Sequence, residues 1–138
     1  QKFELFTLNY NRFQPSMGVP VRTSNGHPRF AKYKINHVVR ELMPEFAWVK
    51  MTDQAEFTDL YRGKLDRIGL DVLSSRFRAI AAAEGDERLV IMCFEDLTKG
   101  LWCHRSIFGA WWRDMTGETV TELGPPPEAA PRVASLFD

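Results

Sequence analysis

The chain has 138 residues and a formal net charge of zero, from 18 basic and 18 acidic side chains. A chain of this length forms one domain, with no room for a second independent core. Hydrophobic residues make up 44% and charged residues 26%, a composition that excludes wholesale disorder. Zero net charge disfavours a strongly electrostatic nucleic-acid or membrane-surface binder, although it leaves room for a local basic groove.

The sequence carries no sign of a membrane or secreted protein. The longest unbroken apolar stretch covers residues 89–94, far short of the roughly twenty residues that cross a bilayer. Cys93 and Cys103 are the only cysteines, whereas small secreted domains usually carry several disulfides. We therefore expect a cytoplasmic protein with no membrane partner, in which both cysteines are reduced thiols.

The first half of the chain predicts short elements separated by a long loop. Alternation of apolar and polar residues predicts a strand over 3–8. Residues 9–30 contain three prolines and two glycines and are predicted to form a loop, with a short extended piece over 19–22. Apolar spacing then predicts a short helix over 35–43, stopped by a proline, and a strand over 46–51.

The second half predicts helices that alternate with strands. Each helix has an apolar stripe and is ended by a glycine, and the strand after the second helix is almost continuously apolar. Such a strand is typical of the centre of a parallel sheet, covered on both faces. The predicted elements are helices over 53–68 and 71–84, a strand over 88–94, a helix that contains 107–115 and a strand over 119–123.

This order of elements predicts the architecture. Strands that alternate with helices favour an α/β sandwich with a mostly parallel sheet, in a single domain over 1–123. The segment 124–138 contains four prolines and is predicted to be a flexible tail. Parallel sheets bind ligands beyond the carboxyl ends of their strands. This rule directs attention to the loop after the first strand and to residues 95–105.

Two cysteines lie in that second segment. Cys93 ends the predicted central strand, and Cys103 begins the next helix, where backbone N–H groups favour negative charge. With His104 and Arg105 beside it, Cys103 would act as a nucleophile, and Arg105 would bind a phosphate or carboxylate. Alternatively, both cysteines are buried apolar residues, because free cysteine is among the most buried residue types.

Acidic residues and a histidine complete this cluster. Glu95 or Asp96 would serve as a general base or hold a sugar hydroxyl, and His104 would orient the substrate or shuttle protons. As the alternative, the two carboxylates are a solvated strand exit.

Metal binding is a further alternative for the same residues. Cys93, Cys103 and His104 offer three soft ligands, and His27 or His37 would supply a fourth. The spacing Cys-x9-Cys-His matches no common zinc pattern, in which paired ligands lie about two to four residues apart. We therefore expect no metal site, and the sequence indicates no particular cofactor.

These residues resemble the family known as domain of unknown function 488. The Cys-x-Glu of 93–95, at the end of an apolar strand, and the Cys-His-Arg of 103–105 are similar to the signature of that family. The Val-Arg of 21–22 and the Pro-x-Phe of 28–30 resemble its N-terminal element. The likeness runs over 3–123 and is strongest to short actinobacterial and phage-borne members.

The resemblance implies a Rossmann-like three-layer fold and a shared polar site, without an established reaction. The chain departs from the family at Pro20, where an aspartate usually precedes Val-Arg, so no role of that aspartate is carried over. The resemblance carries over six candidate site residues: Arg22, Cys93, Glu95, Cys103, His104 and Arg105.

Two functions follow as expectations. Arg22 and Arg105 facing one cleft would suit the phosphate of a nucleotide or nucleic acid, although Arg22 is equally well explained as a surface loop residue. The first expectation is an enzyme that acts on a nucleotide or nucleic-acid-derived substrate, with Cys103 or Glu95 performing the chemistry. The second is a non-catalytic phage or host interaction module.

The end of the tail supports the second expectation. Its Ser-Leu-Phe resembles peptides that dock into the bacterial sliding clamp, with Leu136 and Phe137 as the docking residues. Alternatively, these two side chains pack back onto the domain.

Overall fold

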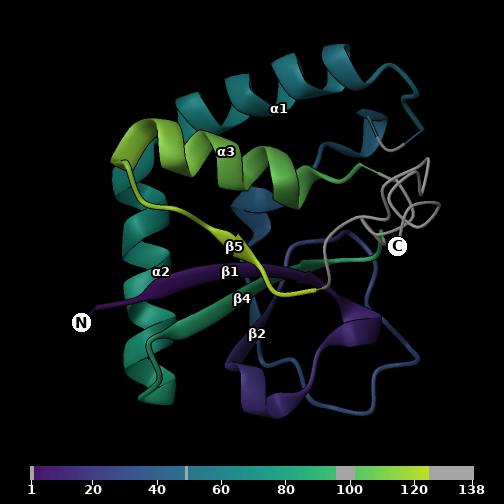
Figure 1. Ribbon diagram of the computed structural model, residues 1–138. Helices are drawn as coiled ribbons and strands as arrows, with labels where there is room; N and C mark the ends of the chain where they lie inside the picture. Colours follow the sequence, from purple (N-terminus) through teal and green to yellow (C-terminus); the bar gives the residue numbers. More distant parts are fainter. Residues whose placement is uncertain (1, 49, 96–101, 125–138) are drawn as a thin grey trace, which may run out of the picture.

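The structure, a computed structural model, describes residues 2–48, 50–95 and 102–124 (Figure 1). In this part of the chain, five parallel strands form one sheet in the order β3-β2-β4-β1-β5. The predicted single α/β domain with a parallel sheet is therefore confirmed. The strands are β1 (Glu4–Asn9), β2 (Val19–Arg22), β3 (His37–Val38), β4 (Arg88–Cys93) and β5 (Thr121–Glu122).

β4 lies in the middle of the sheet, between β2 and β1. Its residues from Leu89 onward are all buried, as the unbroken apolar run of the sequence predicts. Asn9 of β1 pairs with Cys93, and Arg22 of β2 pairs with Met92. This register brings the carboxyl ends of the three strands to one edge of the sheet.

Three helices cover one face of the sheet: α1 (Gln54–Ile68), α2 (Leu70–Glu84) and α3 (His104–Thr116). α1 begins after its N-cap Asp53, whose carboxylate accepts the backbone N–H of Glu56 at 3.1 Å. In the ranges that the structure describes, no helix has both the length and the apolar character needed to span a bilayer. The core on this face includes the buried side chains of Tyr61, Leu65, Phe77, Phe108 and Trp111.

Irregular segments cover the opposite face, and Figure 1 shows them in purple and blue on the far side of the sheet from α1 and α3. Tyr10 and Phe13 are buried there against Val90 and Met92. Tyr33 closes over them and donates its hydroxyl to the Tyr10 carbonyl at 2.7 Å. Aromatic packing therefore orders the long loop that follows β1, including its two 3-10 turns, η1 (Tyr10–Arg12) and η2 (Pro15–Met17).

Two predicted elements differ from the structure. The predicted helix over 35–43 is instead β3, followed by the 3-10 turn η3 (Arg40–Leu42), because β2 offers a free edge for pairing and so short a helix is marginal. The predicted strand over 46–51 is the 3-10 turn η4 (Phe46–Trp48), since no described strand pairs with it. The extended piece over 19–22 is confirmed as β2.

Candidate functional site

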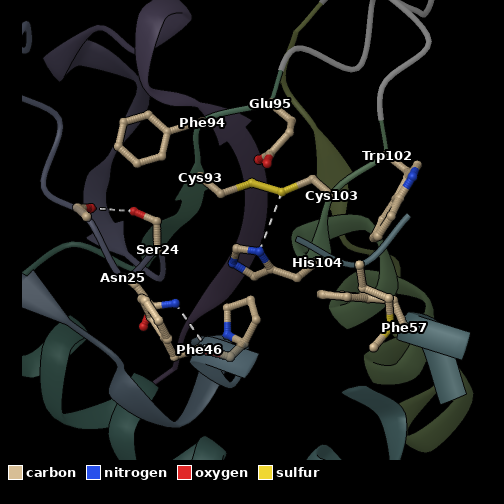
Figure 2. A pocket seen from close by; sticks show the side chains of 13 residues that line it. Ser24, Asn25, Phe46, Phe57, Cys93, Phe94, Glu95, Trp102, Cys103 and His104 are labelled. Carbon is tan, nitrogen blue, oxygen red and sulfur yellow. Dashed lines mark hydrogen bonds between the residues drawn. A yellow bond between two sulfur atoms is a disulfide. The ribbon is translucent and has the colours of Figure 1, made fainter. Parts of the chain in front are cut away.

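A pocket of about 420 Å³ opens at the carboxyl edge of the sheet (Figure 2). Three chain segments supply most of its lining: 24–26 after β2, 93–95 at the end of β4, and 102–104 at the start of α3. The wall is completed by Phe46 of η4, Phe57 of α1, and Pro44 and Met51 of the adjoining chain. The pocket therefore lies where the parallel sheet predicts a ligand.

Cys93 and Cys103 form a disulfide on the pocket floor (Figure 2). The prediction of two reduced thiols is thus wrong for this structure. The physical reason is topological: β4 ends and α3 begins at the same edge of the sheet, so the two side chains meet although they are 10 residues apart in sequence.

His104 lies buried beside the disulfide, and a relay of hydrogen bonds orients its ring. The Thr23 hydroxyl donates its proton to the Met92 carbonyl at 2.8 Å, so it accepts from the His104 Nε2–H at 3.0 Å. The proton of the neutral imidazole is therefore on Nε2. Nδ1 is left as an acceptor, 3.6 Å from the Cys103 sulfur.

The surroundings of His104 keep the ring uncharged. Burial lowers the pKa of His104 to about 4, and the positive charges of Arg105 and Lys64 act in the same direction. At neutral pH the ring is therefore a base or a metal ligand, and not a cation. Its ring centroid lies 5.7 Å from that of Tyr61, which forms the apolar side of its surroundings.

Arg105 is fully buried behind the disulfide and does not line the pocket. It donates two hydrogen bonds to the Glu122 carboxylate, at 3.0 and 2.9 Å. Its Nη1 donates to the Cys93 sulfur at 2.9 Å and to the Glu95 carbonyl at 2.8 Å. Through these hydrogen bonds, Arg105 connects Glu122 of β5 with the end of β4 and places a positive charge against the Cys93 sulfur. Its role as a substrate ligand stays a prediction.

Arg22 lies at the carboxyl end of β2, beneath the loop that lines the pocket. Its Nη1 donates to the carbonyls of Ser24 and Asn25 at 2.8 and 3.1 Å. No acidic side chain in the described part of the chain pairs with it. Within the described residues, Arg22 therefore offers a positive charge without an acidic partner close to the pocket, as anion binding would require.

Aromatic rings form the walls of the pocket. Phe94 packs against Tyr10, with 4.8 Å between ring centroids, and Trp102 packs against Phe57 at the same distance. Phe46 is 85% exposed at the rim. Glu95 is the acidic member of the lining, and Figure 2 shows its side chain beside the disulfide. The other acidic candidate, Asp96, lies outside the described residues.

The residues weighed as alternative metal ligands are only partly brought together. Ligand atoms of Cys93, Cys103 and His104 lie within 4.8 Å of one another, and all three residues are buried. Neither predicted fourth ligand belongs to this group: His27 is not part of it, and His37 contacts Glu84 at 2.6 Å. The set thus has three protein ligands, two of which are available to a metal only in the reduced protein.

The remaining residues are those of the loop after β1 and of the C-terminal tail. Tyr10 and Phe13, in the loop after β1, are buried packing residues and do not line the pocket. Leu136 and Phe137 lie outside the described residues. Sequence reasoning missed Thr23 and Glu122, because nothing local marks a threonine or a glutamate as the partner of a side chain on a distant helix.

Comparison of the chain with models of protein families, with curated proteins and with solved structures finds no match. The resemblance to the domain of unknown function 488 family therefore stays a prediction, and the function has to be argued from the site itself.

Proposed function

We propose that the protein is a cysteine-dependent enzyme that acts on a nucleotide or nucleic-acid-derived substrate. The observation that carries the proposal is the position of the Cys103 sulfur. It lies on the floor of a pocket large enough for a small molecule, at the start of α3 and 3.6 Å from the acceptor nitrogen of His104. A nucleophile, a base and a residue that orients the base, here Thr23, make up the arrangement that cysteine chemistry needs.

The reactive form is the reduced one. A dithiol reductant of the cell would take up the disulfide's oxidising equivalents: its own two thiols become a disulfide, and Cys93 and Cys103 become thiols. The Cys103 thiol then faces His104 Nδ1 as its hydrogen-bond acceptor, and the N-terminus of α3 favours the thiolate, whose proton passes to water because the surroundings of His104 disfavour a charged ring. This requirement favours a reducing compartment such as the cytoplasm.

The lining favours a planar, uncharged group inside the pocket. Phe46, Phe94 and Trp102 offer aromatic faces on which a base can stack, and Ser24 and Asn25 offer polar groups that can read its edge. None of the described lining residues is arginine or lysine, and Glu95 would repel a phosphate placed within.

Two arginines near the pocket, Arg22 and Arg29, supply positive charge instead. Residues 5–40 contain six arginines and lysines and no acidic residue, although the chain as a whole is neutral. Arg22 belongs to this stretch and underlies the pocket loop. Arg29 is exposed next to Phe30, whose ring lies 6.3 Å from that of Phe94. A substrate with its base in the pocket and its phosphate towards Arg22 and Arg29 would fit this division of charge.

The test compares three forms of the reduced protein. Wild type, C103A and E95Q are incubated with a panel of nucleosides, nucleotides and short oligonucleotides, and products are followed by mass spectrometry. We expect C103A to lower turnover by about 100-fold or more while circular dichroism stays native. If E95Q loses turnover and C103A does not, the chemistry belongs to the carboxylate. If reduced Cys103 reacts with iodoacetamide with the pH dependence of an ordinary thiol, the proposal fails.

A non-catalytic binding module is the second candidate. The specific observation in its favour is the exposure of aromatic rings: Phe46 and Phe94 line the pocket and are 85% and 41% exposed, and Phe30, whose ring lies 6.3 Å from that of Phe94, is 50% exposed. Docking of a partner onto these rings would explain their exposure without catalysis. The sequence analysis separately predicts the sliding clamp as a partner of Leu136 and Phe137 in the tail. A pull-down with the clamp that is unchanged by deletion of residues 133–138 would rule out that partner.

A further inference from the structure

We propose that the reduced protein binds a thiophilic divalent cation of the zinc class through Cys93, Cys103 and His104. This inference uses the sulfur of the proposed nucleophile but does not need it to be catalytic. It goes beyond the proposed function by adding a metal-bound state to the dithiol and disulfide states of the same pocket.

The distances suit one shared ion. Zinc binds thiolate sulfur at about 2.3 Å and imidazole nitrogen at about 2.0–2.1 Å, so two ligands of one tetrahedral ion lie roughly 3.5–3.8 Å apart. The Cys103 sulfur and His104 Nδ1 are already 3.6 Å apart, and all three ligand atoms lie within 4.8 Å of one another.

The backbone leaves room for the two sulfurs to separate. The Cα atoms of Cys93 and Cys103 are 7.4 Å apart, wider than the roughly 4.4–6.8 Å common for disulfides. After reduction, the side chains can move apart to the separation that an ion requires without bringing β4 and α3 closer together.

The histidine is held as metal-bound histidines usually are. A ligating imidazole typically donates its other N–H to a fixed acceptor, which sets the tautomer and the ring orientation. His104 donates its Nε2–H to the Thr23 hydroxyl, which the Met92 carbonyl fixes in turn. The free electron pair of Nδ1 therefore faces the sulfurs.

The buried charges also balance. On binding, each of the two thiols loses its proton and binds the divalent cation as a thiolate, so two protons are released. Two thiolates neutralise the ion, while Arg105 and Glu122 neutralise each other through their paired hydrogen bonds. Arg105 Nη1 donates to the Cys93 sulfur at 2.9 Å, the kind of outer contact that stabilises a metal-bound thiolate.

The fourth coordination position would open on the pocket, because three ligands are supplied from its floor. Water or a polar atom of a bound molecule would occupy it, as in zinc sites that are not purely structural. While the ion is bound, the Cys103 sulfur is no longer a free nucleophile. The metal and the disulfide are therefore two alternative ways of blocking the same thiolate.

The experiment titrates the full chain, reduced with a phosphine, with Co²⁺ as a spectroscopic probe and with Zn²⁺ in competition. We expect one equivalent of Co²⁺ to give a tetrahedral spectrum with a sulfur-to-cobalt charge-transfer band, which Zn²⁺ abolishes. The oxidised protein should give no band, a control that needs no mutation. Reduced protein that keeps its native circular dichroism and shows no such band would overturn the inference.

Variants locate the site. C93S and C103S should each roughly halve the charge-transfer band, and H104A should keep the band with affinity lowered by about 10-fold or more. T23V, which removes only the orienting hydroxyl, should weaken binding by about 10-fold. H37A alters a histidine that contacts Glu84 outside the ligand group and should bind as wild type does. A band that persists unchanged in C93S would contradict the assignment.

Alkylation separates this inference from the proposed function. Iodoacetamide labelling of Cys103 is followed by mass spectrometry with and without one equivalent of Zn²⁺, and we expect the ion to slow it at least 10-fold. Fast labelling without cobalt binding would reject the metal site and leave the enzyme proposal standing. Cobalt binding combined with ordinary thiol reactivity of the metal-free protein would reject the proposed nucleophile and keep the metal site.

Discussion

An arginine–carboxylate ion pair lies at each end of β4, and the two pairs differ in the burial of the arginine. At the amino end, Arg88 donates two hydrogen bonds to Asp86, at 3.1 and 2.9 Å. At the carboxyl end, Arg105 donates two to Glu122, at 3.0 and 2.9 Å. The Arg88 side chain is 47% exposed and that of Arg105 is 0% exposed.

This comparison shows that burial, and not hydrogen-bond geometry, separates the two pairs. Water solvates the exposed ions whether or not they are paired, so their pairing contributes little. A buried arginine that loses its carboxylate is left as an uncompensated charge in a poorly solvated place. The pair at the carboxyl end therefore supports the sulfur site next to it, whereas the pair at the amino end is a surface feature.

The largest expected effect is the pH dependence at the carboxyl end. Burial lowers the pKa of His104 in the folded protein to about 4, against 6.5 for the unperturbed group. As the pH falls, the unfolded chain therefore binds this proton at a higher pH than the folded protein does. Stability should therefore fall as pH drops from 6.5 to about 4, by about 3 kcal/mol in all. Urea unfolding of the oxidised protein across this range measures it.

A variant assigns that pH dependence to one residue. H104Q should flatten the profile between pH 6.5 and 4, because glutamine does not titrate. At the amino end of β4, the pH dependence of stability lies at lower pH. The hydrogen bonds from Arg88 lower the pKa of Asp86 below 3.8, so the contribution of Asp86 to stability is lost only in stronger acid. A profile that H104Q leaves unchanged would show that other groups dominate.

E122Q tests the buried pair directly. The substitution keeps the shape of Glu122 and removes the charge that Arg105 faces, so we expect a loss of about 2–3 kcal/mol in the free energy of unfolding. This figure is at or below the usual range for a buried pair, because the Glu122 side chain is 28% exposed. Urea unfolding followed by tryptophan fluorescence measures it, and a loss below about 1 kcal/mol would mean that water reaches Arg105.

G18A tests a packing constraint at the amino end. Gly18 has φ +139, and a Cβ there would lie 2.6 Å from the Arg88 carbonyl oxygen. We expect a loss of about 2 kcal/mol, from backbone strain and the close contact together. G26A is the matched control at the carboxyl end, where a Cβ would only touch the Phe94 ring at 3.7 Å. Equal thermal midpoints for the two variants would contradict the prediction.

The smallest effect is expected for D86N, which breaks the exposed pair at the amino end. Its unfolding midpoint at pH 7 should be close to that of wild type, because both partners remain solvated. A loss as large as that of E122Q would remove the contrast between the two ends of β4.

Local patterns predicted those parts of the fold that depend on local causes. The apolar run of β4 and the stripes of the three helices reflect burial along one element, so their periodicity is visible in the chain. The helix predicted over 35–43 does not form, because the structure of this segment depends on pairing with β2. A short segment adopts whichever backbone pairing its neighbours offer.

Local sequence patterns were enough to predict the fold class, the central strand and the segment that carries Cys93, Glu95, Cys103 and His104. What those side chains face depends on how distant segments pack together. Thr23 meets His104 across 81 residues, and Glu122 meets Arg105 across 17. These partners set the tautomer of the histidine and the charge beside the sulfurs. Such contacts form when distant segments pack at one edge of the sheet, and that packing leaves no periodicity in the sequence for a local pattern to detect.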